Sequence, residues 1–447
     1  LVRSRGLGEV SKRQPHNKKG SSTMAFRRDT HHHRSRLGRG AIATLALTLA
    51  VGTAAPLAAN AAPAYDRSVS YDDFMSHEVL MGAFFTSDGD HSDTLYLSTD
   101  GKRFDELGVA YKDASPTNPN DDTSTLGPIH HTLGDPSIMY HDGAFWMLSG
   151  WNRHDGKFWP MIGVSKDGKT WSFPEGLKFG GKKYPGIALS PGARYGTDIV
   201  APEWFRDNNG QVYIMFSAGY FGLFHGRPYQ DKMVPYLVKV NELHYDGPFE
   251  YNERLPKITF RPGRAQQINF PLPSIDRIDG SAFHDDDGSY YITIKRDGAH
   301  NEIWRNNHMG TGGWQLVNRN AVEGSEGPSL TKLNGHYYLF TDKLHTWGKD
   351  SSRGTLVAEA SSLNGKWAGR GKIATLRKDG SRRANRHGTV IRITDKSAKN
   401  KLYTLWTGKP VPVRTHNTVN FWGWVKSLLK KTSTSTPTKP APNKNRG

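Results

Sequence analysis

The chain has 447 residues, of which 36% are hydrophobic and 11% aromatic, so it is long enough to bury a substantial core. It contains no cysteine, which excludes disulfides, zinc–thiolate sites and thiol nucleophiles. The formal charge of +18 is concentrated at the ends, since residues 1–61 hold 11 Lys/Arg against two acids and residues 426–447 hold six Lys/Arg against none. The middle of the chain keeps a net charge of only +3, which argues against nucleic-acid binding by this part.

Residues 1–61 are expected to contain an upstream extension and a signal peptide. Met24 precedes an arginine-rich stretch, an apolar run over residues 41–57 and the small-x-small site Ala59-Asn60-Ala61. This order is typical of a secretory signal peptide. The apolar run is short and rich in Ala, Gly and Thr, which makes it too weak for a membrane span. We therefore expect a bacterial protein that is secreted or associated with the cell surface.

A unit of two strands joined by a turn recurs five times in the chain. Each copy begins with an acidic residue or His beside a small residue or Pro, continues as an apolar strand, and turns back into an aromatic strand. The first four turns are Asp-Gly or Asn-Gly, which suit tight hairpins. The fifth copy is expected to have a longer turn near residues 396–400 and then a strand over Leu402-Tyr403-Thr404-Leu405. The copies open at Asp135, Glu203, Asp279, Glu326 and His387.

A second marker alternates with these units. It is a Gly turn just before an aromatic residue, at Asp100-Gly101, Asp167-Gly168, Asp246-Gly247, Gly312-Gly313 and Asn364-Gly365. Repeats of roughly 50–75 residues made of antiparallel strands indicate the blades of a β-propeller. We predict an all-β, five-bladed β-propeller over residues 64–425 that forms one domain. Strands near 79–85 and 95–98 are expected to pair with the last blade, because closing the ring removes exposed edge strands.

Residues 426–447 are expected to form a disordered basic tail. The run Thr432–Gly447 consists mainly of Thr, Ser, Pro, Lys and Asn. Such a composition cannot bury a core. A plain solvated tail is favoured over a weak contact with the cell wall.

The residues that open the five copies are expected to face one central cavity, because the innermost strand of each blade starts at the same face. Four carboxyl groups and an imidazole would then converge, which is costly unless their charges are used or neutralised. Close carboxylates also separate their pKa values, so that one is held protonated near neutral pH. An acid and a base that coexist at neutral pH are what glycosidic hydrolysis needs.

The five signatures resemble those of glycoside hydrolase family 43, the five-bladed arabinofuranosidases, arabinanases and xylosidases. The resemblance covers about residues 75–415. It rests on Asp135-Pro136-Ser137, Ala201-Pro202-Glu203, Ile278-Asp279-Gly280-Ser281, Glu326-Gly327-Pro328 and His387-Gly388.

The resemblance implies a role for each matching residue. Asp135 corresponds to the general base, Glu326 to the general acid, and Asp279 to the carboxylate that orients the acid. His387 corresponds to an axial histidine close to a central calcium ion, the one cofactor expected. The family acts by inversion, which requires carboxylates about 6.5–9.5 Å apart.

Some features depart from the family pattern or allow other interpretations. Asp279-Gly280 stands where the family has Asp-Pro, and the long segment before Asp135 leaves Asp72, Asp73 and Asp90 as alternatives for the base. The family has no catalytic role at the position of Glu203, so Glu203 is expected to be structural or to line the pocket. The run Asp285-Asp286-Asp287-Gly288 resembles a calcium loop but lacks the twelve-residue ligand pattern, so we expect a solvated hairpin turn.

Aromatic residues near the copies are expected to bind sugar rings through their flat faces. Trp151 follows the first hairpin, and Tyr220 and Phe221 follow the second. His345 and Trp347 follow the fourth hairpin and are expected to shape the same rim.

The sequence thus predicts an exported, inverting glycoside hydrolase that cleaves arabinofuranosyl or xylosyl linkages, with a carbohydrate as its partner and an activity like that of an α-L-arabinofuranosidase. The alternative is a non-catalytic glycan-binding propeller, motivated by the aromatic rim and the basic tail. A β-fructosidase is not favoured, because the Asn-Asp-Pro-Asn box and the Glu-Cys motif of those enzymes do not occur.

Overall fold

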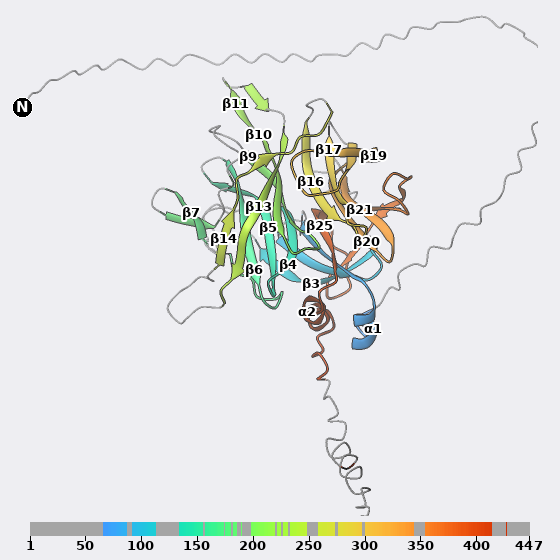
Figure 1. The fold of residues 1–447 in the computed structure, drawn as a ribbon. Coiled ribbons are helices and arrows are strands. Elements are labelled where there is room, and N and C mark those ends of the chain that lie inside the picture. Colours follow the sequence, from blue (N-terminus) through green and yellow to red (C-terminus); the bar gives the residue numbers. More distant parts are fainter. Residues whose placement is uncertain are drawn as a thin grey trace, which may run out of the picture. The chain divides into compact units, whose positions relative to one another are not determined.

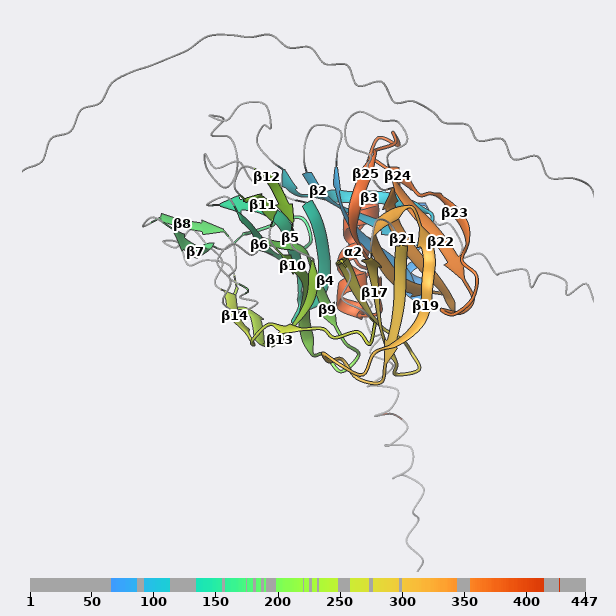
Figure 2. The ribbon, with the colours of Figure 1, turned by 90° about the horizontal axis from the view of Figure 1, so that it is seen from above.

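The computed structural model describes residues 66–413 and Lys426, with gaps at 87–91, 113–133, 155–156, 174, 180–181, 186–188, 190–197, 220, 225–226, 231–232, 248–257, 273–275, 297–299 and 344–353. Antiparallel strands dominate this part and form five blades (Figures 1 and 2). The prediction of a five-bladed β-propeller is confirmed. Among the described helices, none is long and apolar enough to cross a membrane.

One blade is built from both ends of the propeller sequence. Its strands lie in the order β24-β3-β2-β1-β25. The strand β25 is innermost and pairs antiparallel with β1, which confirms that the leading strands close the ring. The bounds are β1 (Val79–Thr86), β2 (Ser92–Ser98), β3 (Arg103–Lys112), β24 (Ala374–Leu376) and β25 (Asn385–Ile393).

The other four blades follow one another along the chain. The first of them consists of β4 (Gly134–His141), β5 (Ala144–His154) and β6 (Lys157–Ser165), and the second of β9 (Asp198–Arg206), β10 (Val212–Gly219), β13 (Val234–Tyr245) and β14 (Ile258–Pro262), with β15 (Gln266–Gln267) beside β13. The third consists of β16 (Arg277–His284), β17 (Tyr290–Arg296), β18 (His300–Asn306) and β19 (Gln315–Glu323). The fourth consists of β20 (Ser325–Leu333), β21 (His336–Lys343), β22 (Thr355–Ala360) and β23 (Ala368–Lys372). Two hairpins are added by β7 (Glu175–Phe179) with β8 (Lys182–Pro185) and β11 (Phe221–Phe224) with β12 (Arg227–Gln230). The innermost strands β4, β9, β16, β20 and β25 contact one another in a closed ring.

Every innermost strand carries a β-bulge at the same point of the repeat. The residues at the bulge are Asp135, Ala201, Asp279, Gly327 and His387, and the first four have φ values of 52°, 45°, 59° and 58°. A bulge bends its strand and redirects the side chains beside it. The bulges also give the true alignment of the copies, in which Glu326 precedes the shared position by one residue and Glu203 follows it by two. The sequence alignment, which treated all five opening residues as equivalent, was wrong at these two.

The segment after β25 is helical, contrary to the predicted strand over residues 402–405. Helix α2 (Lys396–Thr407) begins at the N-cap Asp395 and ends at Gly408 in the left-handed conformation. Its buried residues Ala398, Lys399, Leu402, Tyr403 and Trp406 recur at helical spacing, which explains why a helix forms.

Helix α1 (Tyr71–Ser76) packs beside α2, as Figure 1 shows at the lower edge of the blades. The Phe74 ring lies 5.8 Å from that of Trp406, and the Tyr71 ring lies 5.3 Å from that of Tyr403. Asp72 and Asp73, two of the alternatives for the base, are exposed residues of α1. Asp90, the third alternative, lies outside the described residues.

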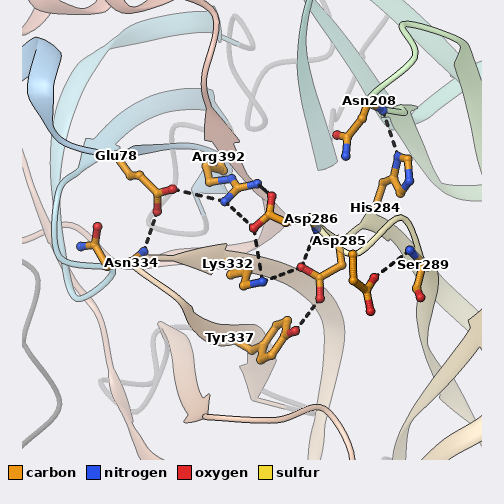
Figure 3. A network of polar contacts seen from close by, with 11 residues as sticks. Glu78, Asn208, His284, Asp285, Asp286, Ser289, Lys332, Asn334, Tyr337 and Arg392 are labelled. Carbon is orange, nitrogen blue, oxygen red and sulfur yellow. Dashed lines mark hydrogen bonds and ion pairs between the residues drawn. The ribbon is translucent and has the colours of Figure 1, made fainter.

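The predicted hairpin turn at residues 285–288 joins β16 to β17 and is exposed to solvent from Asp286 to Gly288, and two of its acids also pair with cations (Figure 3). Asp285 is 2% exposed, receives a hydrogen bond from Tyr337 and pairs with Lys332 Nζ at 2.7 Å. Asp286 pairs with Lys332 and with Arg392, so the ion pairs form a network that connects three blades. These contacts lower the pKa of Asp286 to about 2, chiefly through its hydrogen bond with Arg392. Lys332 and Arg392 therefore supply cationic partners for these two carboxylates.

This network is expected to matter for stability. Replacing Lys332 by Met leaves Asp285 buried without its cation, and removing one partner of a buried pair costs about 3 kcal/mol or more. Urea unfolding of Lys332→Met should show this loss. Lys102→Met is the matched control, because Lys102 pairs with Glu359 at an exposed site, where such pairs contribute about 0–1 kcal/mol. Equal losses in the two variants would contradict the prediction.

Candidate active site

Four of the five residues that open the copies meet at one end of the innermost strands. Asp135 lies on β4, Asp279 on β16, Glu326 on β20 and His387 on β25. His387 Nδ1 lies 2.9 Å from Asp135 Oδ1, and the backbone N–H of Gly327 donates to Asp279 Oδ2 at 3.3 Å. The closed ring of innermost strands thus brings residues more than 250 positions apart into one cluster.

Two cations tie the carboxylates of this cluster together. Lys295, on β17, lies 3.0 Å from Glu326 Oε2 and 3.4 Å from Asp279 Oδ2. Arg386 Nη2 lies 3.0 Å from Glu326 Oε1, and its Nε lies 2.6 Å from Asp342 Oδ2 on β21. Both oxygens of Glu326 therefore have a cationic partner. The side chain of Glu326 is also the most accessible of the three predicted catalytic carboxylates, at 18% against 9% for Asp135 and 7% for Asp279.

The charges of the cluster shift several pKa values. Burial alone would lower the pKa of His387, but the carboxylates of Asp135, Asp279 and Glu326 outweigh it and raise that pKa to about 9. Burial would likewise lower the pKa of Lys295, and Asp279 and Glu326 reverse the direction. Burial raises the pKa of Asp342, against the opposing effect of Arg386. The cluster thus places carboxyl groups and cations in direct contact.

The residues around His387 do not fit a calcium ion. Its Nδ1 lies 2.9 Å from Asp135 Oδ1 and is therefore not free to bind a metal. Within the described ranges, no group of three or more His, Asp or Glu side chains could hold a metal ion. Lys295 and Arg386 bring positive charge of their own to the carboxylates. The calcium ion stays a prediction of the family resemblance, and no step below uses it.

A further carboxyl group, which the sequence analysis missed, borders the cluster. Asp93 is fully buried on β2, and its Oδ2 accepts a hydrogen bond from Ser149 Oγ at 2.7 Å. Burial and, to a smaller extent, the nearby charge of Asp135 raise the pKa of Asp93 to about 7, against the effect of its hydrogen bond with Ser149. Asp93 therefore adds a second acidic group beside the proposed base.

Sequence reasoning also missed Lys295, Arg386 and Asp342. Lys295 and Asp342 lie at the ends of second strands, outside the signatures that were compared. Arg386 immediately precedes His387 and stands at the position that Glu326 occupies in β20. When the copies are aligned at their bulges, Arg386 and Glu326 occupy equivalent positions. This alignment would have identified Arg386 as a candidate site residue.

The residues expected to bind sugar lie largely outside the described residues. This applies to Tyr220, His345 and Trp347. Trp151 lies on β5 and Phe221 on β11, where the structure describes the backbone alone. Their role stays a prediction.

The Asp135–His387 pair predicts how stability depends on pH. Because the pKa of His387 is about 9 in the folded protein and about 6.5 in an unfolded chain, the pair stabilises fully below pH 6.5 and loses its contribution as the pH rises through 9. The expected loss is on the order of 3 kcal/mol. Urea unfolding of the wild type and of His387→Gln at pH 6, 8 and 9.5 measures it. The variant should lose less stability over this range, and equal pH slopes would contradict the assignment.

A scan against protein-family models gave no match, and a search of the curated proteins gave none. Solved structures with a similar fold include an exo-beta-1,3-galactanase from Clostridium thermocellum, 15% identical over 53% of this chain and 47% of that chain, with a TM-score of 0.37. An exo-beta-1,3-galactanase variant from Phanerochaete chrysosporium is 18% identical over 54% and 50%, with a TM-score of 0.36. A mutant Trypanosoma rangeli sialidase is 16% identical over 60% and 42%, with a TM-score of 0.40. At these identities the likeness concerns the fold alone, and the chain spans about half the length of these structures.

Proposed function

We propose that the protein is an inverting glycoside hydrolase of the family 43 type. The observation that carries the proposal is the cluster itself, in which Asp135, Asp279 and Glu326 come from three different blades and meet at one end of the propeller axis. A pair of carboxyl groups that act as acid and base is the machinery of glycosidic hydrolysis.

Each carboxylate has a role that its contacts support. Glu326, the most accessible of the three, protonates the leaving oxygen. Asp135 accepts a proton from the attacking water and is oriented by His387. Asp279 shares Lys295 with Glu326 and so orients the acid. Both oxygens of Glu326 have a cationic partner, so an incoming sugar must displace one of these partners to contact a Glu326 oxygen.

For the substrate we propose an arabinofuranosyl or xylosyl linkage in a polysaccharide, as the family resemblance implies. The signal-like segment before residue 62 supports export. The basic tail remains available for a weak contact with an anionic cell wall, although a plain solvated tail is favoured. Neither the sugar nor the location follows from the cluster, so each needs its own measurement.

The test is sugar release by the purified chain from aryl α-L-arabinofuranoside, aryl β-D-xyloside, arabinan, arabinoxylan and β-1,3-galactan. Proton NMR of the first product formed should show the anomer opposite to that of the substrate, because inversion is a single displacement by water. Retention of the anomer would overturn the inverting mechanism. Release from the galactan alone would keep the hydrolase and replace the proposed sugar.

A second function is favoured by one observation. Both oxygens of Glu326 have cationic partners, which hold the side chain in place as a hydrogen-bond acceptor. A non-catalytic glycan-binding propeller would keep such a carboxylate to bind sugar hydroxyl groups. Calorimetric binding of one of the five glycans without release of sugar would support this alternative over hydrolysis.

A further inference from the structure

The second strands of three neighbouring blades bring a side chain to the contacts around Glu326 from one position of the repeat. This position lies opposite the residue that precedes the bulge of the innermost strand, and it holds Lys295, Asp342 and Phe85. The first of these side chains contacts one oxygen of Glu326. The other two contact Arg386, which binds the second oxygen. The two cations of Glu326 therefore have different supports.

Arg386 is fixed by two contacts besides the one with Glu326. Its Nε lies 2.6 Å from Asp342 Oδ2, while its Nη2 lies 3.0 Å from Glu326 Oε1. Its guanidinium carbon lies 5.5 Å from the centre of the Phe85 ring, and the side chain is 5% exposed. Because the N–H groups of a guanidinium lie in one rigid plane, a rotation that takes Nη2 away from Glu326 also takes Nε away from Asp342. Arg386 is therefore a fixed partner of Oε1.

Lys295 is held less firmly at the other oxygen of Glu326. Its Nζ lies between Glu326 Oε2, at 3.0 Å, and Asp279 Oδ2, at 3.4 Å, and the side chain is 14% exposed. An ammonium group on a flexible stem has no plane to maintain, so Lys295 can leave Glu326 and stay with Asp279. An incoming sugar thus displaces Lys295 more easily than Arg386.

The contact with Asp342 makes the difference between the two cations. Asp342 is 0% exposed, and it lies opposite Glu326 in the β20–β21 pair. In the part of the chain that the structure describes, its Oδ1 is buried without a hydrogen-bond partner. A buried carboxyl group is costly, and an apolar side chain would fill the same space without that cost. The presence of Asp342 therefore points to its contact with Arg386.

We propose that Asp342 is a positioning residue of the active site, which fixes Arg386 on Oε1 of Glu326 and so leaves Oε2 as the oxygen that meets the leaving oxygen of the sugar. This inference rests on the proposed hydrolase function and names the working oxygen of its acid. Sugar binding moves Lys295 from Glu326 towards Asp279, and Arg386 keeps its place. The proton on Oε2 passes to the leaving oxygen as the glycosidic bond breaks, and the water that attacks the sugar carbon gives its proton to Asp135.

Two variants of Asp342 test the proposal. Asp342→Ala removes the partner of Arg386 Nε, and Asp342→Asn keeps an acceptor oxygen at nearly the same size without the charge. The values of kcat/KM are compared on the polysaccharide that the wild type degrades and on a dinitrophenyl glycoside of the same sugar, which needs little protonation of its leaving group. We expect Asp342→Ala to lose about 10–100-fold on the polysaccharide, because a small misplacement of a catalytic group costs on that order, and much less on the dinitrophenyl substrate. Asp342→Asn should recover part of the loss, and it carries the test if the Ala variant does not fold.

Asp105→Ala and Asp105→Asn are the matched controls. Asp105 lies on β3 and is likewise a buried carboxylate beside an arginine, since its Oδ1 lies 3.0 Å from Arg103 Nε. Its loss should lower the stability measured by urea unfolding. The ratio of the activities on the two substrates should stay as in the wild type.

The outcomes separate this inference from the proposed function. Equal losses on both substrates would make Asp342 a structural residue only and overturn the inference, and so would full activity of Asp342→Ala on the polysaccharide. If the wild type releases no sugar from any substrate, the proposed function fails, and crystal structures of the wild type and of Asp342→Ala test the positioning by itself. Arg386 should leave Oε1 of Glu326 in the variant alone. An unchanged contact between Arg386 and Glu326 in the variant would overturn the inference without reference to activity.

Discussion

Replacing Glu326 by Gln is expected to lower kcat/KM on polysaccharide substrates by on the order of 10²–10⁴-fold, the contribution typical of a positioned general acid. The amide keeps the size of the side chain but cannot deliver a proton to the leaving oxygen. The fold should persist, because Lys295 retains Asp279 and Arg386 retains Asp342 as partners. Circular dichroism and urea unfolding of the variant check that the loss is not one of structure.

The leaving group distinguishes an acid from a residue that merely binds. A dinitrophenyl glycoside departs as a stable anion and needs little protonation, whereas a sugar hydroxyl needs a proton as the bond breaks. The loss in Glu326→Gln should therefore be much smaller on the dinitrophenyl substrate than on the polysaccharide. Asp135→Asn is the control, because loss of the base should slow the attack of water on both substrates alike. Equal losses for both substrates in Glu326→Gln would show that Glu326 is not the acid, and full activity would remove it from the mechanism.

Much of the fold could be predicted because its repeating unit occurs five times in the sequence. The hairpin turns at Asp142-Gly143 and Asn334-Gly335 adopt positive φ at both central residues, as the Asp-Gly and Asn-Gly pairs required. The same reliance on repetition produced the error at residues 402–405, where a fifth strand was expected by analogy with four others. The spacing of Leu402, Tyr403 and Trp406 was helical, and this local period should have outweighed the analogy.

The site was predictable where its residues belong to the signatures and unpredictable where they do not. Asp135, Asp279, Glu326 and His387 are signature residues, and the ring of innermost strands brings them together. Lys295 and Asp342 reach the cluster from second strands, so their place depends on the twist and packing of each blade. No spacing along the chain encodes that arrangement. The bulges also shifted Glu203 and Glu326 away from the shared position, which a comparison of letters alone does not reveal.

Gly388→Ala is expected to have the largest effect on stability. Gly388 lies opposite Phe84 in the β1–β25 pair that closes the ring. A Cβ added to Gly388 would lie 1.9 Å from the carbonyl oxygen of Ala83, a backbone atom that cannot move without opening this pair. Overpacking in a well-packed interior costs about 1–3 kcal/mol and occasionally more, and a clash this close with backbone should exceed that range. Urea unfolding followed by tryptophan fluorescence measures the loss.

Gly108→Ala is the matched control, because Gly108 lies on β3 of the same blade and an added Cβ there meets nothing within 4 Å. That change should be neutral or stabilise by up to about 1 kcal/mol, since Ala restricts the unfolded chain. A small loss in Gly388→Ala would mean that the ring tolerates a wider gap between β1 and β25 than its packing implies. A large loss, with sugar release lost in parallel, would show that closure also holds together the cluster around Glu326. His387 precedes Gly388 on β25, so the pairing that closes the propeller is also the pairing that places this imidazole against Asp135.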